Sequence, residues 1–181
     1  MKCNRRNFLK MSATALLVNT LPISALATTV KSTDVKRTLS FYNTHTLETL
    51  TVCYFDQEGY RLGALAEINH ILRDHRTNEI QPIDLNLLDQ LFAIKVRIRP
   101  RTPFHIISGY RSEATNALLR QTTSGVAKAS YHTKGQAIDI RLPEHSTLRL
   151  RDLCLKFKAG GVGYYPRSNF VHLDTGQYRT W

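Results

Sequence analysis

The sequence predicts an α+β protein in which a small antiparallel sheet is flanked by helices. Two long segments with helical spacing of apolar residues, 62–75 and 84–98, lie in the first part of the chain, and short alternating segments dominate the end. Helices that precede a group of strands favour an α+β fold over a doubly wound parallel sheet. A length of 181 residues is suited to one domain.

Each expected strand is a short run in which apolar and polar residues alternate. The strands are expected at 37–43, 49–55, 104–108, 136–142, 160–165 and 169–175. Only five residues separate the first two strands, so these are expected to form a hairpin. The last two flank Pro166 and are expected to pair with each other.

Each expected helix has apolar residues every three or four positions. The helices are expected at 62–75, 84–98, 113–120 and 146–158. Asp84 is a suitable N-cap for the second helix, and Pro100 and Pro103 interrupt the chain after it. A polar loop is expected over 124–135.

Residues 1–27 have the features of an export signal, so the folded domain is expected to comprise 28–181. A basic start precedes a modest apolar run, and Ala25 and Ala27 form a cleavage site of the A-x-A kind. The pair Arg5-Arg6, followed by x-Phe-Leu-Lys, resembles a twin-arginine signal, which implies export to the periplasm. No run reaches the roughly 18 apolar residues of a membrane span, so no stable span is expected after cleavage.

The net charge of +11 predicts an anionic partner. Removal of residues 1–27, which hold four cations and no acid, leaves a net charge of +7. Export from the cytoplasm argues against nucleic acid as the partner and favours an acidic lipid or cell-wall polymer.

Cys53 and Cys154 remain after cleavage of the signal, and two free buried thiols are preferred over a disulfide. The sequence does not indicate an oligomeric state.

The segment 130–139, Ser-Tyr-His-Thr-Lys-Gly-Gln-Ala-Ile-Asp, has the residue types of a metal site. The side chains of His132 and Asp139 are zinc ligands at about 2.0–2.2 Å, yet seven residues of straight strand span roughly 23 Å. The loop must therefore fold back, and Gly135 provides the conformational freedom for that turn. Asp139 lies between two isoleucines, where an unpaired carboxylate is costly to bury.

A second segment, 169–174, adds His172 and Asp174, which are two positions apart and so share one face of a strand. Two histidines and one carboxylate leave an open position on a tetrahedral zinc ion, which is typical of catalytic rather than structural sites. At such a position the metal lowers the pKa of a water molecule towards 7.

The pattern S-x-H-x-x-G-x-A-x-D over 130–139, followed by a late His on a strand, resembles the LAS clan of zinc peptidases. This clan includes lysostaphin-type enzymes, D-Ala-D-Ala peptidases and the hedgehog signalling domain, which implies a hedgehog/DD-peptidase-like fold. Residues 37–181 resemble one branch in particular, the murein endopeptidase K type. That branch shares Ser108-Gly109-Tyr110-Arg111-Ser112, the segment 160–169 and the ending Phe170-Val171-His172-x-Asp174-x-Gly176 with Trp181.

The resemblance implies a secreted zinc endopeptidase that cuts the peptide cross-links of peptidoglycan. It implies one Zn²⁺ ion held by His132, Asp139 and His172. It also implies that Arg111 holds a substrate carbonyl or carboxylate, for which its planar fork is suited. Ser130 and Tyr131 are implied to line the cleft for the peptide stem, and the bonds cut are the 3-3 diaminopimelate link and the 4-3 type.

The chain departs from the clan at the general base. D-Ala-D-Ala peptidases with an E-x-W-H ending use that Glu as the base, and Asn169 stands at the matching position. Asn cannot accept a proton at neutral pH. Asp174 is one candidate base, with orientation of a zinc ligand as its alternative role. His105 and Glu113 are weaker candidates.

Three functions remain open at this point. The first is the zinc endopeptidase. The second is a non-catalytic, zinc-stabilised module that binds peptidoglycan, which the missing Glu keeps open. The third is a carboxypeptidase that releases terminal D-Ala.

The roles of two further pairs of residues also remain open. His45 and His105 can line the cleft or lie on the surface. Tyr164 and Tyr165 can stack on substrate or pack in the sheet.

Overall fold

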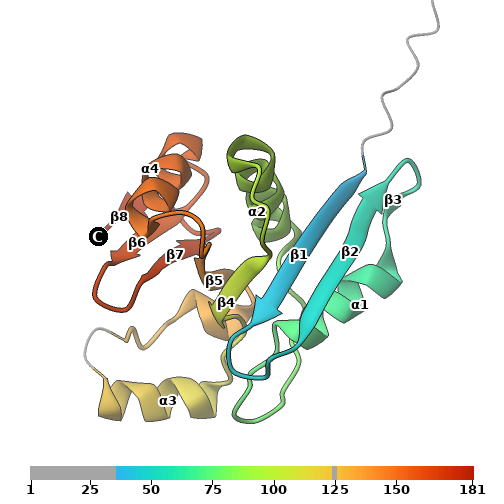
Figure 1. Ribbon diagram of the computed structural model, residues 1–181. Helices are drawn as coiled ribbons and strands as arrows, with labels where there is room; N and C mark the ends of the chain where they lie inside the picture. The colour runs from blue at the N-terminus through green and yellow to red at the C-terminus, as the bar shows by residue number, and fades with distance from the viewer. Residues whose placement is uncertain (1–35, 124–125) are drawn as a thin grey trace, which may run out of the picture. The chain divides into compact units, whose positions relative to one another are not determined.

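A computed structural model describes residues 36–123 and 126–181, which fold around an eight-stranded sheet (Figure 1). The strands are β1 Arg37–Asn43, β2 Thr49–Asp56, β3 Gly59–Tyr60, β4 Phe104–Ser108, β5 Ala137–Arg141, β6 Gly161–Tyr165, β7 Phe170–Asp174 and β8 Arg179–Thr180. The α-helices are α1 Leu62–Ile71, α2 Leu85–Ile98, α3 Glu113–Thr122 and α4 Thr147–Phe157. A single 3₁₀ turn covers Tyr131–Lys134. The α+β class is confirmed, and so are the N-terminal hairpin and the pairing of β6 with β7.

The expectation of a small antiparallel sheet is wrong, because the sheet is larger and mixed. Its order is β3-β2-β1-β4-β5-β7-β6-β8, and β1 with β4 and β6 with β8 run parallel. Parallel neighbours need a long crossover connection, and the segment that holds α1 and α2 provides it between β1 and β4. Alternation of apolar and polar residues identifies a strand but does not report its direction relative to its neighbour.

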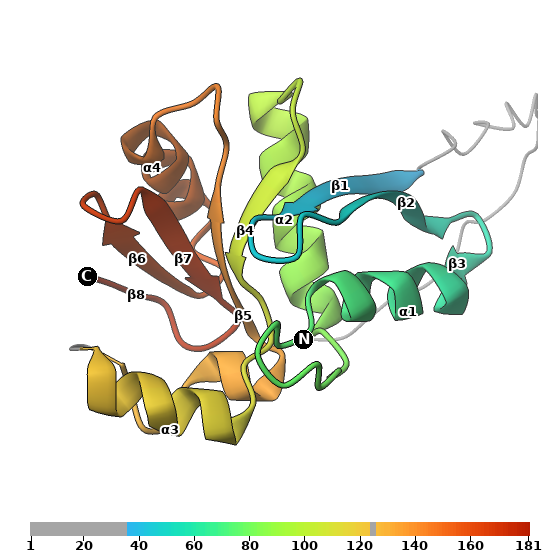
Figure 2. The ribbon, with the colours of Figure 1, turned by 60° about the horizontal axis from the view of Figure 1, so that its bottom comes forward.

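One face of the sheet is covered by α1, α2 and α4, and this is where the core lies. Ile138, Ile140, Val171 and Leu173 are buried in that core. Because side chains alternate along a strand, the residues between them point to the opposite face. Figures 1 and 2 show that α3 lies apart from α2 and α4, next to the loop that leads into β5. The sheet face opposite the core is therefore the one available for a functional site.

The helix ends follow local capping chemistry. The Asp84 carboxylate accepts a hydrogen bond from the Asn86 amide, which confirms the expected N-cap of α2. Helix α1 ends at Ile71, four residues before its predicted end. Asp74 has left the helix there, and its carboxylate accepts hydrogen bonds from the amides of Arg76 and Ser112, both at 2.8 Å. Asp74 thereby ties the end of α1 to the start of α3.

Cys53 and Cys154 are both free thiols, but the expectation that both are buried is wrong, because Cys53 on β2 is only partly buried. Cys154 lies in the core, where burial raises the pKa of its thiol to about 12, so it is not reactive. Between residues 36 and 181, apart from 124–125, no helix has the length and apolar character needed to cross a bilayer. The expected signal segment, 1–27, lies outside the described residues.

Candidate metal centre and substrate cleft

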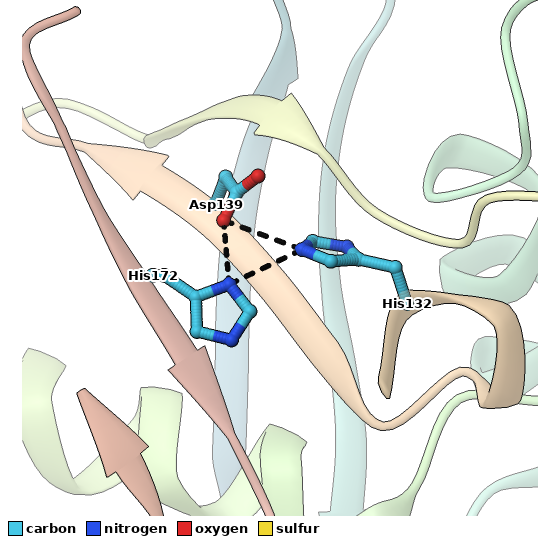
Figure 3. A group of neighbouring side chains, drawn as sticks. All are labelled: His132, Asp139 and His172. Atoms are coloured by element: carbon cyan, nitrogen blue, oxygen red, sulfur yellow. Dashed lines mark hydrogen bonds and ion pairs between the residues drawn. The ribbon is translucent and has the colours of Figure 1, made fainter. Parts of the chain in front are cut away.

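The side chains of His132, Asp139 and His172 meet on the side of the sheet opposite the core, and all three are buried (Figure 3). Nδ1 of His172 lies 2.8 Å from Oδ1 of Asp139 and 3.2 Å from Nε2 of His132. The third side of this triangle, from His132 Nε2 to Asp139 Oδ1, is 3.3 Å. Asp139 comes from β5, His172 from the facing register position on β7, and His132 from the 3₁₀ turn. One donor atom of each residue thus points to a common centre.

The spacing of these atoms fits a tetrahedral zinc ion. Ligands at about 2.0–2.2 Å from such an ion are roughly 3.3–3.5 Å apart. The separations of 3.2 and 3.3 Å lie close to that range, whereas the 2.8 Å between His172 and Asp139 is a hydrogen-bond distance that would lengthen if a metal replaced the proton between them. Three protein ligands leave a fourth position for a water molecule or substrate, as catalytic zinc sites do.

The hydrogen bonds of the two imidazoles point their free lone pairs at the centre. Nδ1 of His132 lies 2.7 Å from the carbonyl oxygen of Gly109, which can only accept, so this nitrogen donates. Nε2 of His172 donates in the same way to Oδ2 of Asp174 at 3.0 Å. When both imidazoles are neutral, the remaining nitrogens, Nε2 of His132 and Nδ1 of His172, face the Asp139 carboxylate with a lone pair. A cation is the natural partner for three such atoms.

The charges around the centre make Asp139 an anion. Burial would raise the pKa of Asp139, but the neighbouring His132 and His172 hold it well below its usual range. Burial lowers the pKa of His132. Burial also acts to lower the pKa of His172, but its hydrogen bonds to Asp139 and Asp174 outweigh this and raise the pKa to about 9. Without a metal, Nδ1 of His172 is therefore protonated at neutral pH and donates to Asp139, and a bound metal would replace that proton.

The turn that presents His132 has the geometry that the spacing predicted. The Ser130 hydroxyl accepts a hydrogen bond from the His132 amide at 3.3 Å, which caps the 3₁₀ turn. Gly135 ends the turn with φ +66°, a conformation that residues with a side chain rarely adopt. A β-carbon there would also collide with the carbonyl oxygen of Pro82. The chain folds back at Gly135, and His132 reaches Asp139.

Asp174 lies behind His172 and away from the cleft. Its carboxylate has no exposed surface and accepts hydrogen bonds from the amides of Gly161 and Gly176 at 3.0 and 2.9 Å. Arg179 adds two more contacts, at 2.6 and 3.1 Å. Burial opposes ionisation, but these bonds and the one to His172 hold the pKa of Asp174 well below its usual range. Asp174 is thus a fixed anion in hydrogen-bond contact with His172.

The three residues of the candidate metal centre line a cleft of about 720 Å³. Arg111, Ser130 and Tyr131 line the same cleft, as the sequence analysis expected, and Asp174 does not. The Arg111 guanidinium lies 3.6 Å from Oδ2 of Asp139 and 3.3 Å from the Ser108 hydroxyl. Its side chain is 12% exposed, and burial lowers its pKa. An arginine stays charged under these conditions, so Arg111 is a fixed cation beside the metal centre.

Two walls of the cleft consist mainly of residues that had not been assigned to the site, apart from Tyr165, which had been left open between substrate stacking and sheet packing. One wall comes from α3 and the loop after it and is mostly apolar, with Leu119, Val126, Ala127 and Ala129. The other comes from β6, β7 and the C-terminal segment, and it contains Tyr165, Phe170, Arg179 and Trp181. No local pattern marks these residues, because only the pairing of β8 with β6 brings the C-terminal segment to the site.

The weaker candidates lie elsewhere. His45 stacks on His75 with ring centroids 3.8 Å apart, and His105 packs against Tyr42 at 4.7 Å. Neither histidine lines the cleft, and nor does Glu113. Asn169 is exposed in the turn between β6 and β7 with φ +54°, which Asn tolerates better than Glu. Within the described part of the chain, Asp139 is the only Asp or Glu residue that lines the cleft.

Residues 31–181 match the peptidase family described as peptidoglycan L,D-endopeptidase MepK. The chain is 47% identical to the peptidoglycan L,D-endopeptidase MepK of Escherichia coli K12 over 178 residues, which cover 98% of this chain and 97% of the relative. It is 39% identical to the probable peptidoglycan L,D-endopeptidase MepK of Haemophilus influenzae, with coverages of 98% and 95%. No solved structure matches the chain significantly.

Proposed function

This chain belongs to the family of peptidoglycan L,D-endopeptidases described as MepK, and on that basis we propose that it is a zinc-dependent murein endopeptidase of the periplasm. Membership of a peptidase family makes it an enzyme, so the alternative of a non-catalytic binding module is set aside. The substrate is the peptide portion of peptidoglycan. The proposed bonds are the 3-3 link between two diaminopimelate residues and the 4-3 type.

One observation carries the zinc assignment: the convergence of His132, Asp139 and His172, which line the cleft, on a common centre. Two neutral imidazoles and one carboxylate match the donor set of catalytic zinc sites. Zinc bound there supplies a Lewis acid that polarises a carbonyl group and activates water for attack. The protein contributes the orientation of the ligands and a cleft that holds the peptide beside them.

Arg111 is the proposed catalytic residue that binds the substrate oxygen. Its guanidinium is fixed by Asp139 and by the Ser108 hydroxyl, and it faces the cleft. A fixed cation next to the carbonyl under attack stabilises the negative charge that develops on its oxygen. Ser130 and Tyr131 are proposed to contact the peptide from the side of the turn.

Asp174 is proposed to orient His172 rather than to act as the general base. A base must reach the proton that it removes, directly or through one water molecule. Asp174 is fully buried, and His172, Arg179 and two backbone amides occupy its oxygens. This arrangement supports the second of the two roles that the sequence left open.

Digestion of defined substrates tests the proposal. The purified protein is incubated with 3-3 and with 4-3 cross-linked muropeptide dimers, and the products are identified by mass spectrometry. We expect zinc-dependent conversion of dimers to monomers, with the 3-3 dimer cut. Release of free D-Ala with intact dimers would instead identify a carboxypeptidase. Cleavage that survives complete removal of metal would contradict the zinc assignment.

Residues 1–27 are proposed to direct export by the twin-arginine route. The support is the Arg5-Arg6 motif, together with a substrate that lies outside the cytoplasm. Replacement of both arginines by lysine is expected to retain the protein in the cytoplasm, as cell fractionation would show. Normal periplasmic accumulation of this variant would contradict the proposed route.

A further inference from the structure

Tyr165 and Trp181 form a hydrogen-bonded pair on the cleft wall that has no place in the mechanism described so far. Nε1 of Trp181 lies 2.8 Å from the Tyr165 hydroxyl oxygen. The backbone of Trp181 is fixed to β6, because its amide donates to the Val162 carbonyl at 3.3 Å and its carbonyl accepts from the Tyr164 amide at 2.9 Å. Both side chains line the cleft.

The direction of this hydrogen bond determines what Tyr165 can do. An indole N–H can only donate, so the Tyr165 oxygen accepts. The O–H of Tyr165 is then left to donate, and residues 36–123 and 126–181 offer it no acceptor at hydrogen-bond distance. The tyrosine ring is also held from the other strand by Phe170, which stacks on it with a centroid distance of 4.5 Å. Tyr165 therefore presents an oriented donor to the cleft.

The register of the sheet places Tyr165 close to the candidate metal centre. Gly163 pairs with His172, and the indole of Trp181 lies directly over Gly163. The Cα atom of Tyr165 is two residues further along the same face of β6, roughly 6.6 Å from that of Gly163. The indole ring of Trp181, to which the Tyr165 hydroxyl is hydrogen-bonded, lies 5.3 Å from the His172 ring. The hydroxyl is thus within reach of a substrate residue bound at the candidate metal centre.

We propose that Tyr165 is a substrate-binding residue whose O–H donates a hydrogen bond to a free carboxylate of the diaminopimelate residue next to the cleaved bond, and that Trp181 is the residue that positions it. The inference rests on the proposed function, because the cross-link supplies this carboxylate. Arg111 and Arg179, which line the same cleft, give it a positive character that suits an anionic group.

Kinetics of matched variants test the inference. Tyr165→Phe removes the hydroxyl, and Tyr164→Phe is the control, because Tyr164 packs against Arg151 and does not line the cleft. On the 3-3 dimer we expect Tyr165→Phe to raise KM by roughly 10- to 100-fold with little change in kcat, as for a lost hydrogen bond to a charged group. Trp181→Phe is expected to raise KM in the same direction. The double variant should be no worse than Tyr165→Phe alone.

A binding measurement gives a readout without turnover. Trp181 is the only tryptophan in the chain, so the intrinsic tryptophan fluorescence reports from the cleft itself. The metal-loaded protein is titrated with the tetrapeptide muropeptide monomer, a product that carries the carboxylate. We expect a saturable change in emission, with a dissociation constant at least 10-fold higher for Tyr165→Phe and unchanged for Tyr164→Phe.

The outcomes separate this inference from the proposed function. A wild-type protein that leaves dimers intact would contradict the endopeptidase, while the titration would still test Tyr165. A Tyr165→Phe variant that matches Tyr164→Phe in both KM and binding would overturn the inference and leave the zinc site untouched. A loss in kcat alone would also overturn it, because the hydroxyl would then act on the reacting atoms. Additive losses in the double variant would refute the positioning role of Trp181.

Discussion

Nε2 of His172 lies 3.0 Å from Oδ2 of Asp174, a carboxylate with no surface exposed to solvent. The other partners of Asp174 are the amides of Gly161 and Gly176 and the guanidinium of Arg179. The His172 imidazole is therefore held from the side away from the cleft by the Asp174 carboxylate. Three further hydrogen-bond partners, two backbone amides and one guanidinium, hold that carboxylate in place. Asp174 determines which nitrogen of His172 is free to bind a metal.

Asp174→Asn is expected to weaken zinc binding by roughly 10- to 100-fold, because an amide cannot hold both Arg179 and His172 as the carboxylate does. Chelator competition measures the affinity. Cleavage should return when zinc is in excess, since the reacting groups are still present. The matched control is Asp152→Asn, an exposed residue on α4. Inactivity of Asp174→Asn even with zinc fully bound would point to Asp174 as the base after all.

Arg111→Lys is expected to lower kcat by about 100- to 1,000-fold, because lysine cannot reproduce the fixed, forked donor next to the metal centre. The zinc content should not change, since Arg111 is not a ligand. Arg120→Lys, at an exposed position of α3 that does not line the cleft, is the control and should retain full activity. Near-normal kcat in Arg111→Lys would contradict the role of the guanidinium.

Gly135→Ala is expected to lower the free energy of unfolding by about 1–3 kcal/mol, because φ +66° disfavours a β-carbon and the Pro82 carbonyl occupies its space. Gly63→Ala is a matched control in α1, where a β-carbon meets nothing within 4 Å. That variant should be unchanged or up to about 1 kcal/mol more stable. Urea denaturation measures both. Equal stabilities of the two variants would contradict the strained turn.

Asp74 predicts a dependence of stability on pH. Burial would raise its pKa, but hydrogen bonds from Thr115, Arg76 and Ser112 lower it to about 2. Because the folded-state pKa lies below the unfolded value, this carboxylate stabilises the protein above about pH 4, and the contribution is lost as the pH falls towards 2. Asp74→Asn should therefore cost about 2 kcal/mol at pH 7 and little at pH 2. An exposed control, Glu58→Gln, should cost nothing measurable, and a pH-independent loss in Asp74→Asn would contradict this account.

Local patterns predicted most of the helices and strands and selected the three side chains that converge in the candidate metal centre. The hairpin, the four helices and the Asp84 cap follow from periodicity and capping, which depend on neighbouring residues alone. His132, Asp139 and His172 were found because their residue types, the position of Gly135 and the strand alternation agree with one another.

Features that depend on long-range pairing could not be predicted in the same way. The parallel pairing of β1 with β4 and of β6 with β8 has no local signal. For the same reason the C-terminal wall with Arg179 and Trp181 was missed, and Tyr165 was left undecided between substrate and packing. Asn169 was seen only as a missing base, whereas its positive φ shows that the turn itself favours this residue.

The zinc content of the purified protein and of ligand variants tests the central claim most directly. We expect one zinc ion per wild-type chain by elemental analysis, with cleavage of the 3-3 dimer that is lost on chelation and restored by zinc. His132→Ala and Asp139→Ala should lose both the metal and the activity while they keep the fold by circular dichroism, and His105→Ala should keep all three. Full zinc occupancy in the two ligand variants, or cleavage by wild-type protein free of metal, would contradict the assignment of this site.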